Sequence, residues 1–241
     1  VSCNVFFYTV GQRFGLEKLT HWYGKLGIGQ PTNCGLTPEH AGYLPKLDAK
    51  GHIANSKLGI QDAIQMGIGQ GPVEWTPLQC ANVYATLARN GLSLQPTFVL
   101  SPAHLQESHQ IKLDAAGRKD VLRGMYESVN DRRGSSNHLV KLNGEKVFNI
   151  PDVTIRGKTG TATPPARWID DNNDSKIQSY EVTKSEDLGD HAWFVGMVYR
   201  KNENTPAFIV SVVVEYAGSG GAVSGPIANQ IFWALRQEGY L

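Results

Sequence analysis

The sequence of 241 residues has little of what builds disulfide frameworks or metal sites. Its three cysteines, Cys3, Cys34 and Cys80, are too few and too widely spaced for a disulfide framework or a zinc site. None of the seven histidines occurs in an H-E-x-x-H pattern or pairs with a cysteine at ligand spacing. We therefore expect no metal and no cofactor. Cys3 is expected to be a small buried residue and not a reactive thiol.

The chain also has almost no net charge and no long apolar run. The formal net charge of +1 gives no electrostatic footprint for nucleic acid or for an anionic membrane surface. No run approaches the roughly 20 apolar residues of a membrane span, and no signal-peptide pattern opens the chain. Because the first residue is Val1, we expect the chain to be a piece of a longer protein, with any targeting segment upstream. Its length suits one large domain or two small ones.

The glycines at positions 67, 69 and 71 resemble part of a dinucleotide-binding loop, but their context does not fit. Such a loop follows a strand and opens a helix directly. Here no strand is predicted before the glycines, Pro72 occupies the place of the third glycine, and the next helix is expected only at Pro77. The segment therefore predicts a loop with a permissive backbone, and no nucleotide site.

Hydrophobic periodicity predicts helices first, then strands, then one more helix. The helices are expected over residues 4–15, 16–26, 77–89, 115–130 and from 224 onward, and the strands over 153–162, 191–199 and 206–216. Residues 30–60 predict a long ordered loop and residues 163–190 a polar one. The last two strands are almost continuously apolar, as in strands that are covered on both faces. We expect the three strands in antiparallel succession, with the last helix packed on their sheet.

Two helices carry clear signals at their ends. Thr76 is a natural N-cap, Pro77 suits the first helical position, and Gln79 can complete a capping box. Ser224 is a possible cap of the last helix. The faces expected to point to the core are Leu78, Ala81, Ala85 and Ala88 in the first of these helices, and Ile227, Ile231, Ala234 and Leu235 in the last.

A lysine, two threonines and a glycine lie together on the first predicted strand, at residues 158–161. Lys158 and Gly160 should point to one face and Thr159 and Thr161 to the other, unless the strand edge is open to a cleft. A glycine inside a strand often marks the close approach of a ligand. Beside a cleft, this ammonium and these hydroxyls would suit a carboxylate. The alternative is an ordinary edge strand with a solubilising lysine.

Hydroxyl, amide and ammonium groups together are the parts of a serine acyl-transfer site that lacks histidine. The signature of such a site is S-x-x-K, then S-x-N, then K-T-G on a strand. Ser2 and Asn4 supply S-x-N, and residues 128–130 and 135–137 match the same pattern. Ser2 lies far upstream of Lys158 and leads into an amphipathic helix, so order and context favour it. Ser2 could also serve as a helix N-cap, a role that is compatible with catalysis.

With these motifs in this order, the chain resembles the C-terminal part of the transpeptidase domain of a class B, monofunctional penicillin-binding protein. The resemblance implies an α+β fold with an antiparallel sheet flanked by helices, an all-helical lobe, and an active site between them. Residues 1–150 would form mainly the helical lobe, and residues 151–241 three strands and the closing helix of the same domain. The matching segments are residues 2–4 (SCN), 67–71 (GIGQG), 76–79 (TPLQ), 157–162 (GKTGTA), 191–196 (HAWFVG) and 220–235.

One motif of that family is missing from the sequence. No S-x-x-K occurs anywhere in the 241 residues. The resemblance implies that the nucleophilic serine, its lysine and the strands before them lie upstream of Val1, so this chain alone is expected to be inactive. One alternative is a penicillin-binding-like module that binds a peptide or partner without turnover. Another is a β-lactamase or β-lactam sensor, against which the segment 67–79 and the length of chain after S-x-N argue.

The resemblance also implies roles in D,D-transpeptidation, the cross-linking of D-alanyl-D-alanine stem peptides of peptidoglycan. Ser2 would relay a proton to the leaving amine beside Lys158, and Asn4 would bond the substrate amide. The two threonine hydroxyls would hold the terminal carboxylate, and the N–H of Thr161 would help bind the oxyanion. β-Lactams would occupy the same site, on the periplasmic side of a bacterial inner membrane, with the anchor upstream. The implied catalytic residues are Ser2, Asn4 and Lys158, and the implied substrate-binding residues are Thr159, Gly160 and Thr161.

Other residues of the segment 191–196 are expected to pack and not to react. Trp193 and Phe194 belong to an apolar strand and suit the core. His191 is expected to pack or to form a hydrogen bond near the cleft, with no chemical role.

Overall fold

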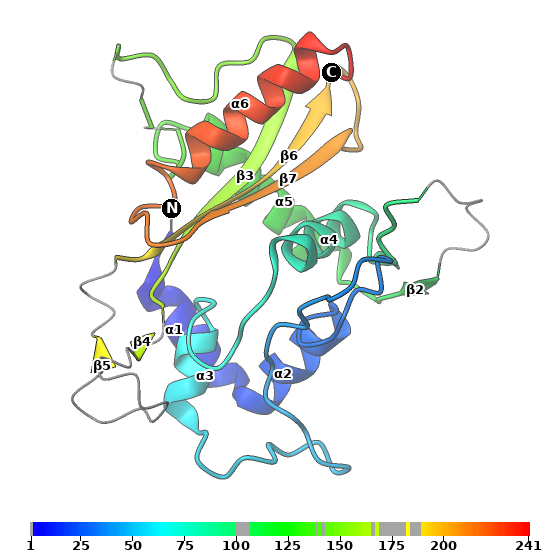
Figure 1. Ribbon diagram of the computed structural model, residues 1–241, viewed down its shortest axis with the longest axis vertical. Helices are drawn as coiled ribbons and strands as arrows, with labels where there is room; N and C mark the ends of the chain where they lie inside the picture. Colours follow the sequence, from blue (N-terminus) through cyan, green and yellow to red (C-terminus); the bar gives the residue numbers. More distant parts are fainter. Residues whose placement is uncertain are drawn as a thin grey trace.

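The helices and the long strands follow the predicted order of helices, strands and a last helix, with a pair of short strands between the fourth and fifth helices. The structure is a computed structural model that describes residues 2–99, 107–137, 139–140, 143–164, 167–168, 182–183 and 189–241. Figure 1 shows α1, α2 and α3 grouped at one end of the molecule and the long strands at the other, with α4 between them. The elements are α1 (Asn4–Phe14), α2 (Leu16–Lys25), α3 (Ile60–Met66), α4 (Pro77–Ala88), β1 (Leu92–Leu94), β2 (Ser108–Gln110), α5 (Ala115–Asn130), β3 (Val153–Ala162), β4 (Arg167–Trp168), β5 (Val182–Thr183), β6 (His191–Arg200), β7 (Phe208–Val214) and α6 (Ser224–Gln237).

The position of the predicted nucleophilic serine lies outside the part of the chain that the structure describes. The nucleophilic serine is expected upstream of Val1, and Val1 itself lies outside the described residues. The placement of the nucleophile therefore stays a prediction, whereas Ser2 and the residues after it can be placed in the fold.

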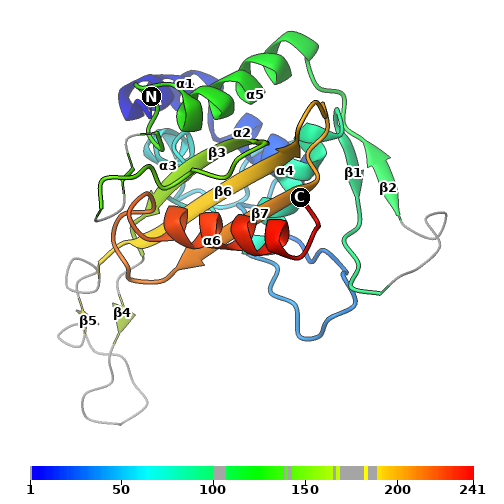
Figure 2. The same cartoon turned by 90° about the horizontal axis from the view of Figure 1, so that it is seen from above.

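The three long strands form one antiparallel sheet in the order β3-β6-β7, as expected. β3 and β6 pair along their whole length, from Val153 opposite Arg200 to Ala162 opposite His191. Figure 2 shows α6 lying on one face of this sheet and α5 beyond the other. The sheet is therefore the middle layer between the closing helix and the rest of the chain.

Alternating side chains of β6 supply core on both faces of the sheet. Phe194 and Val198 are fully buried and pack in one cluster with Phe232 of α6. Met197 and Tyr199 pack on the opposite face, against helix α5 and partly buried residues of α4. The prediction of a strand covered on both faces is confirmed for β6. β7 is only half-buried along its length, since no described strand lies beyond it.

Helices α1 and α3 approach each other closely at two glycines. A Cβ at Gly67 would lie 2.5 Å from the carbonyl oxygen of Phe7, and a Cβ at Gly11 would collide with the carbonyl oxygen of Ala63. The sequence did not predict α3, because seven residues are too short for a clear periodic signal. The close approach fixes the loop after α3 relative to the start of α1.

The start of α4 is built as the sequence predicts. The Thr76 hydroxyl accepts from the N–H of Gln79 at 3.1 Å, and the Gln79 side chain accepts from the N–H of Thr76 at 2.7 Å. The amide nitrogen of buried Gln79 also donates to the carbonyls of Gln30 at 2.9 Å and Ala41 at 2.8 Å. One side chain thus caps the helix and fastens the long loop of residues 30–59, which contains no helix or long strand.

The apolar stripe predicted for the core face of α4 is wrong at most positions, since Ala88 alone of its four residues packs against a core cluster. The buried residues of this helix are instead Gln79, Cys80, Val83 and Thr86. The predicted stripe is half-exposed, and it lines an open groove of about 450 Å³ together with Phe208. Periodicity identified a stripe of small apolar residues but could not tell which neighbour covers it. The groove is lined by Leu78, Ala81, Ala85 and Ala88.

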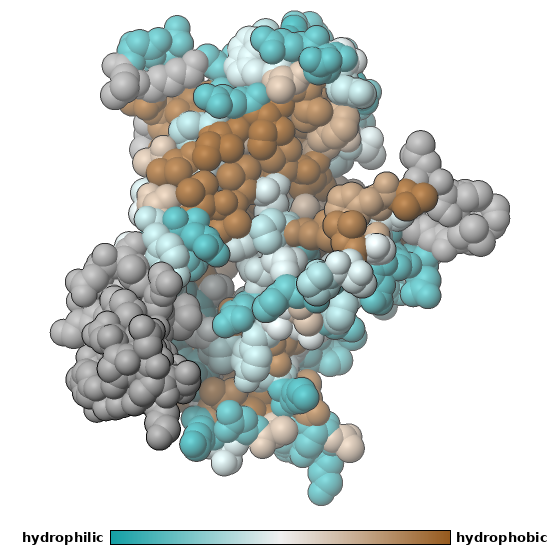
Figure 3. Space-filling model, in the orientation of Figure 1, coloured by the Kyte–Doolittle hydropathy of each residue, from teal (hydrophilic) through white to brown (hydrophobic). Residues whose placement is uncertain are grey.

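The face predicted for α6 is also wrong at most positions. Ile227 and Ile231 remain 37% and 38% exposed, and Ala234 is exposed as well, whereas Leu235 is partly buried. Ala228 and Phe232 face the sheet instead, because α6 carries apolar residues on more than one side. Apolar residues gather over α6 and the β7 side of the sheet (Figure 3). The N-cap of α6 is Val223, and the buried hydroxyl of Ser224 donates to the carbonyl of Ala192 at 2.7 Å instead of capping the helix.

Candidate active site

A cleft of about 730 Å³ lies between the start of α1, the loop after α3 and the end of β3. Segments far apart in the sequence meet there: the S-x-N residues open α1, and the K-T-G residues lie on the strand opposite. The edge of β3 is open to this cleft. All the residues singled out from the sequence line it, namely Ser2, Asn4, Lys158, Thr159, Gly160 and Thr161.

The S-x-N residues stand at the beginning of α1. The N-cap position belongs to Cys3, which makes no side-chain cap, so the N-cap reading of Ser2 is wrong and its hydroxyl is not used there. Cys3 is exposed, like the residues of the first turn of α1 that follow it, so the expectation that it is buried is wrong too. Tyr8 lies one turn after Asn4, on the same side of the helix, and also lines the cleft. Its i, i+4 spacing from Asn4 was the signal available in the sequence.

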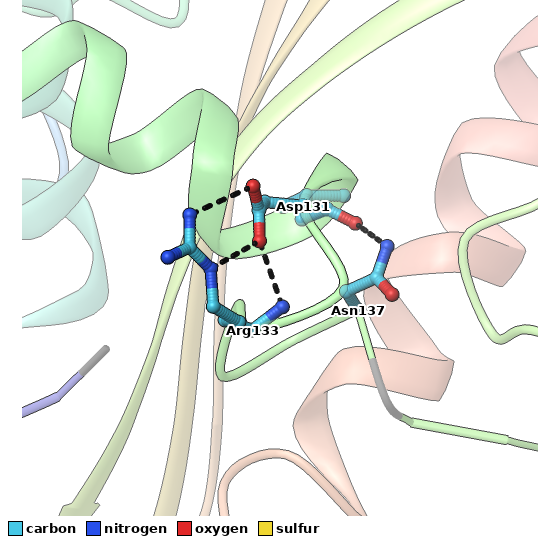
Figure 4. A network of polar contacts seen from close by, with 4 residues as sticks. Asp131, Arg133 and Asn137 are labelled. Carbon is cyan, nitrogen blue, oxygen red and sulfur yellow. Dashed lines mark hydrogen bonds and ion pairs between the residues drawn. The ribbon is translucent and has the colours of Figure 1, made fainter.

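The two other S-x-N matches are occupied in holding the end of α5. The amide nitrogen of Asn130 donates to the carbonyl of Ile155 at 2.9 Å, and that of Asn137 donates to the carbonyl of Val129 at 2.9 Å. Figure 4 shows Asn137 beside the ion pair of Asp131 and Arg133, at the point where the chain turns back after the helix. Neither asparagine lines the cleft, which agrees with the choice of Ser2 and Asn4.

Lys158 is the cation of the cleft. Burial lowers the pKa of Lys158, because a desolvated ammonium loses its hydration. Its Nζ donates to the carbonyl oxygen of Thr159 at 2.6 Å, so the head group is held close to the strand edge. A fixed, partly desolvated ammonium gives a stronger positive potential than one in water.

The two threonines lie on the opposite side of β3 from Lys158, as alternation predicts. The hydroxyl of Thr161 accepts from the N–H of Gly220 at 3.3 Å, and its own proton remains available for donation. A side chain at Gly220 would collide with the carbonyl oxygen of Gly160, so only glycine lets this segment lie against the strand. A Cβ at Gly221 would lie 3.6 Å from Cγ2 of Thr159. The segment after β7 therefore packs behind both threonines.

The loop after α3 forms the side of the cleft that sequence reasoning did not assign. Gln65, near the end of α3, and Ile68, Gln70 and Gly71 of the loop line the cleft. The amide nitrogen of Gln70 reaches across and donates to the carbonyl oxygen of Thr161 at 3.3 Å. The match at residues 67–71 pointed to this segment, but not to the contact that it makes.

Comparison with known proteins decides the family. Residues 1–233 match the family model described as the penicillin binding protein transpeptidase domain. The chain belongs to this family. The expected α+β transpeptidase fold is thereby confirmed.

The relatives of this transpeptidase domain include proteins named peptidoglycan D,D-transpeptidase MrdA. The one from Haemophilus influenzae is 29% identical over 239 residues, which cover 95% of this chain and 34% of that protein. The one from Escherichia coli K12 is 27% identical over 234 residues, with 95% of this chain and 35% of that protein covered. The transpeptidase chain therefore spans about a third of the length of these relatives.

Solved structures agree on the fold. A crystal structure of Pseudomonas aeruginosa PBP2 in complex with WCK 5153 aligns with a TM-score of 0.68 at 25% identity, covering 96% of this chain and 46% of that one. PBP2 from Helicobacter pylori, in its complex with MreC, aligns with a TM-score of 0.68 at 23% identity, covering 99% and 39% of the two chains. The second comparison supports the fold alone.

A smaller cavity of about 230 Å³ lies behind the K-T-G strand of this transpeptidase domain. Trp193 is half-buried and lines it with Trp75, their ring centroids 6.5 Å apart, so the expectation that Trp193 is in the core is wrong. Phe194 is fully buried, as expected. Burial raises the pKa of Cys80, which also lines this cavity, to about 12 and keeps the thiol protonated. His191 accepts from the N–H of Tyr216 at 3.1 Å and packs against its ring, as predicted, but it is not among the residues that line the cleft.

Proposed function

We propose that this chain forms the substrate-binding part of a penicillin-sensitive peptidoglycan D,D-transpeptidase. The observation that supports this most strongly is that S-x-N and K-T-G line one cleft. In this proposal the chain is part of a single transpeptidase domain, in which residues 1–150 supply mainly the helical lobe and residues 151–241 supply strands and the closing helix. A segment of the same protein upstream of Val1 supplies the S-x-x-K serine and lysine, and this chain without it is inactive.

The reaction is a serine acyl transfer in two steps. The upstream serine oxygen bonds to the carbonyl carbon between the two D-alanines, and the bond to the nitrogen of the terminal D-alanine breaks. The serine proton passes by way of the upstream lysine and Ser2 to that nitrogen, which leaves as an amine. The amine of a second stem peptide then attacks the acyl-enzyme, forms the cross-link and frees the serine.

The residues of the cleft bind and orient this substrate. Lys158 sets the proton balance of the Ser2 hydroxyl and adds positive potential, and the amide of Asn4 bonds the substrate amide. The hydroxyls of Thr159 and Thr161 hold the terminal carboxylate, at a strand where Gly160 permits close approach. The N–H of Thr161 is one of two oxyanion donors, each worth roughly 3 kcal/mol of barrier in comparable sites. β-Lactams acylate the same serine. No cofactor takes part.

The proposed location is the periplasmic face of a bacterial inner membrane. In the described parts of the chain, no helix is both long and apolar enough to cross a membrane. The anchor in this proposal belongs to the upstream segment, like the nucleophile.

Acylation by a labelled penicillin tests the proposal. Mass spectrometry of this chain alone should find no covalent adduct, whereas the complete protein should carry one adduct on a serine upstream of Val1. An adduct on a serine within residues 1–241 would contradict the assignment of the nucleophile.

A module that binds peptides without turnover is the second candidate, and the absence of S-x-x-K from these residues favours it. The same experiment separates the two. A complete protein that binds a D-alanyl-D-alanine peptide but forms no penicillin adduct would be such a module.

A further inference from the structure

Gln70 reaches across the cleft from a backbone that is firmly held. Its neighbours Gly69 and Gly71 have φ of 76° and 75°, in the left-handed region that favours glycine. Its N–H donates to the carbonyl oxygen of Gln65 in α3 at 3.0 Å. From this position the amide nitrogen of Gln70 donates to the carbonyl oxygen of Thr161 at 3.3 Å. The backbone of the loop is fixed, and among the described residues the side chain that crosses the cleft is held by this one hydrogen bond.

The carbonyl that Gln70 occupies belongs to the open edge of β3. In an antiparallel strand, the N–H and C=O of one residue point to the same side, and the side alternates along the strand. Since the carbonyl of Thr161 points away from β6 and toward Gln70, those of Thr159 and Thr161 both face the cleft. The Thr159 carbonyl accepts from Nζ of Lys158 at 2.6 Å. Both carbonyls at this edge are thus occupied by side chains of the protein.

An open strand edge is a template on which an extended peptide can add as a further strand. Such a peptide donates backbone N–H groups to the carbonyls of the edge. At Thr161 the donor would compete with Gln70, because the two approach the same oxygen from the cleft.

We propose that Gln70 is a positioning residue that occupies the Thr161 carbonyl in the empty cleft and releases it to a backbone N–H of the peptide substrate. This inference rests on the proposed function, because it takes the substrate to be an extended peptide in this cleft. It adds a competition between a side chain and the substrate for one acceptor atom.

The geometry of the contact suits release. The Gln70 bond is 3.3 Å long and exposed, near the long end of the range for such bonds. The amide of Gln79, which serves structure, is buried and donates at 2.8 and 2.9 Å to two carbonyls, with a longer third contact of 3.5 Å to the carbonyl of Gly27. The exposed contact of Gln70 is therefore easier to replace than the buried contacts of Gln79.

Steady-state kinetics of the complete protein test the inference, with an N-acylated tripeptide ending in D-alanyl-D-alanine as substrate. Gln70→Ala frees the carbonyl, so KM should fall about twofold to tenfold, the range that corresponds to one net hydrogen bond, with kcat unchanged. Gln70→Leu keeps most of the volume without a donor and should show the same fall. A rise in KM, or a loss of kcat, in both variants would mean that Gln70 only ties the two sides of the cleft together, and would overturn the inference.

Methylated peptides separate competition from a general effect. The same peptide is made with a methyl group on each backbone nitrogen in turn, so that one N–H at a time is lost. For one of these peptides the KM values of the wild type and of Gln70→Ala should become equal. That peptide lacks the N–H that would bond the Thr161 carbonyl, so freeing the carbonyl no longer improves its binding. An equal effect of Gln70→Ala on every peptide would overturn the inference.

Two further measurements keep the outcomes distinct. Thermal unfolding of each variant shows whether it is folded. The side-chain NMR signal of Gln70 in the wild type should shift when the peptide is added, and an unmoved signal at saturating peptide overturns the inference.

Penicillin acylation of the wild type decides the proposed function separately. Failure of acylation refutes both, whereas acylation with unchanged KM in the Gln70 variants refutes the inference alone.

Discussion

Lys158 joins two properties that matter for an acyl-transfer cleft. Burial lowers the pKa of its ammonium, and the carbonyl of Thr159, 2.6 Å away, holds that ammonium at the strand edge. An ammonium that gives up its proton more readily can share a proton with a neighbouring hydroxyl. Under the proposed function, it attracts the substrate carboxylate while it is protonated. The burial of Lys158 therefore sets the pH at which it loses the charge that the proposed chemistry uses.

The pH dependence of penicillin acylation in the complete protein should report this residue. An exposed lysine loses its proton near pH 10.4, and because the pKa of Lys158 is lowered, it should lose its proton and its positive potential at a lower pH. We predict that the acylation rate falls on the alkaline side at a pH below that value. In Lys158→Arg the guanidinium stays charged, so the alkaline fall should move to higher pH. An identical profile in both proteins would assign the fall to another group.

The hydroxyl of Thr161 is prepared to donate, because the N–H of Gly220 already occupies its acceptor side. We predict that Thr161→Val slows acylation of the complete protein by a penicillin roughly 10- to 100-fold, as for loss of one hydrogen bond to a charged group. Thr161→Ser keeps the hydroxyl and should stay near the wild-type rate. The control ligand is the same penicillin with its carboxylate esterified. An equal loss with that ester would contradict the carboxylate role.

At the residue scale, the sequence placed the motif residues well but missed their partners. Motif spacing identified Ser2, Asn4 and Lys158 because the family resemblance rests on residue types in order. Tyr8 and Gln70 were missed, since their place in the cleft depends on how α1 and α3 meet. The packing of α1 against α3 depends on close backbone contacts at Gly11 and Gly67, which no sequence pattern predicts.

At the element scale, α4 shows how one side chain can fix a helix and a loop together. Gln79 accepts from Thr76 and donates to two loop carbonyls while fully buried. Gln79→Ala should lower the free energy of unfolding of the chain by about 3 kcal/mol, because it removes the hydrogen bonds to the backbone of Thr76, Gln30 and Ala41, each worth about 1 kcal/mol. Thr76→Ala should cost only about 1 kcal/mol, the usual loss for an N-cap. Urea denaturation of both variants and the wild type measures these differences.

Gln79→Glu is the matched control for that comparison. It keeps an acceptor for the N–H of Thr76 but loses the donors to Gln30 and Ala41. It should therefore be destabilised more than Thr76→Ala, and similar losses in Gln79→Ala and Thr76→Ala would show that the loop contacts contribute little.

The sequence predicted where long elements lie better than which face they bury. Caps, breakers and apolar runs located α4, α5 and the three long strands, because these signals are local. The predicted buried faces of α4 and α6 were wrong at most positions, because both helices carry apolar residues on more than one side. Which side is buried depends on a sheet that forms from distant segments, and periodicity carries no information about it.

At the scale of the whole molecule, the apolar faces beside β7 remain uncovered. β7 has no second strand partner among the described residues, and Ile227, Ile231 and the groove at Phe208 flank it on its two faces. A long apolar strand edge of this kind favours pairing with another strand or aggregation. Under the proposed function, the upstream segment that brings the nucleophile also brings the chain that covers this edge.

Hydrogen exchange and one substitution test this last point. The amides of β7 that face its open edge should exchange at least about tenfold more slowly in the complete protein than in this chain, because pairing protects them. Ile231→Lys should change the stability of this chain by less than about 0.5 kcal/mol, as at an exposed site. In the complete protein the same change should cost more than about 2 kcal/mol, because the lysine would then be buried without a partner. Equal exchange rates and an equal small cost in both proteins would place the upstream segment elsewhere and leave β7 as a true edge of the sheet.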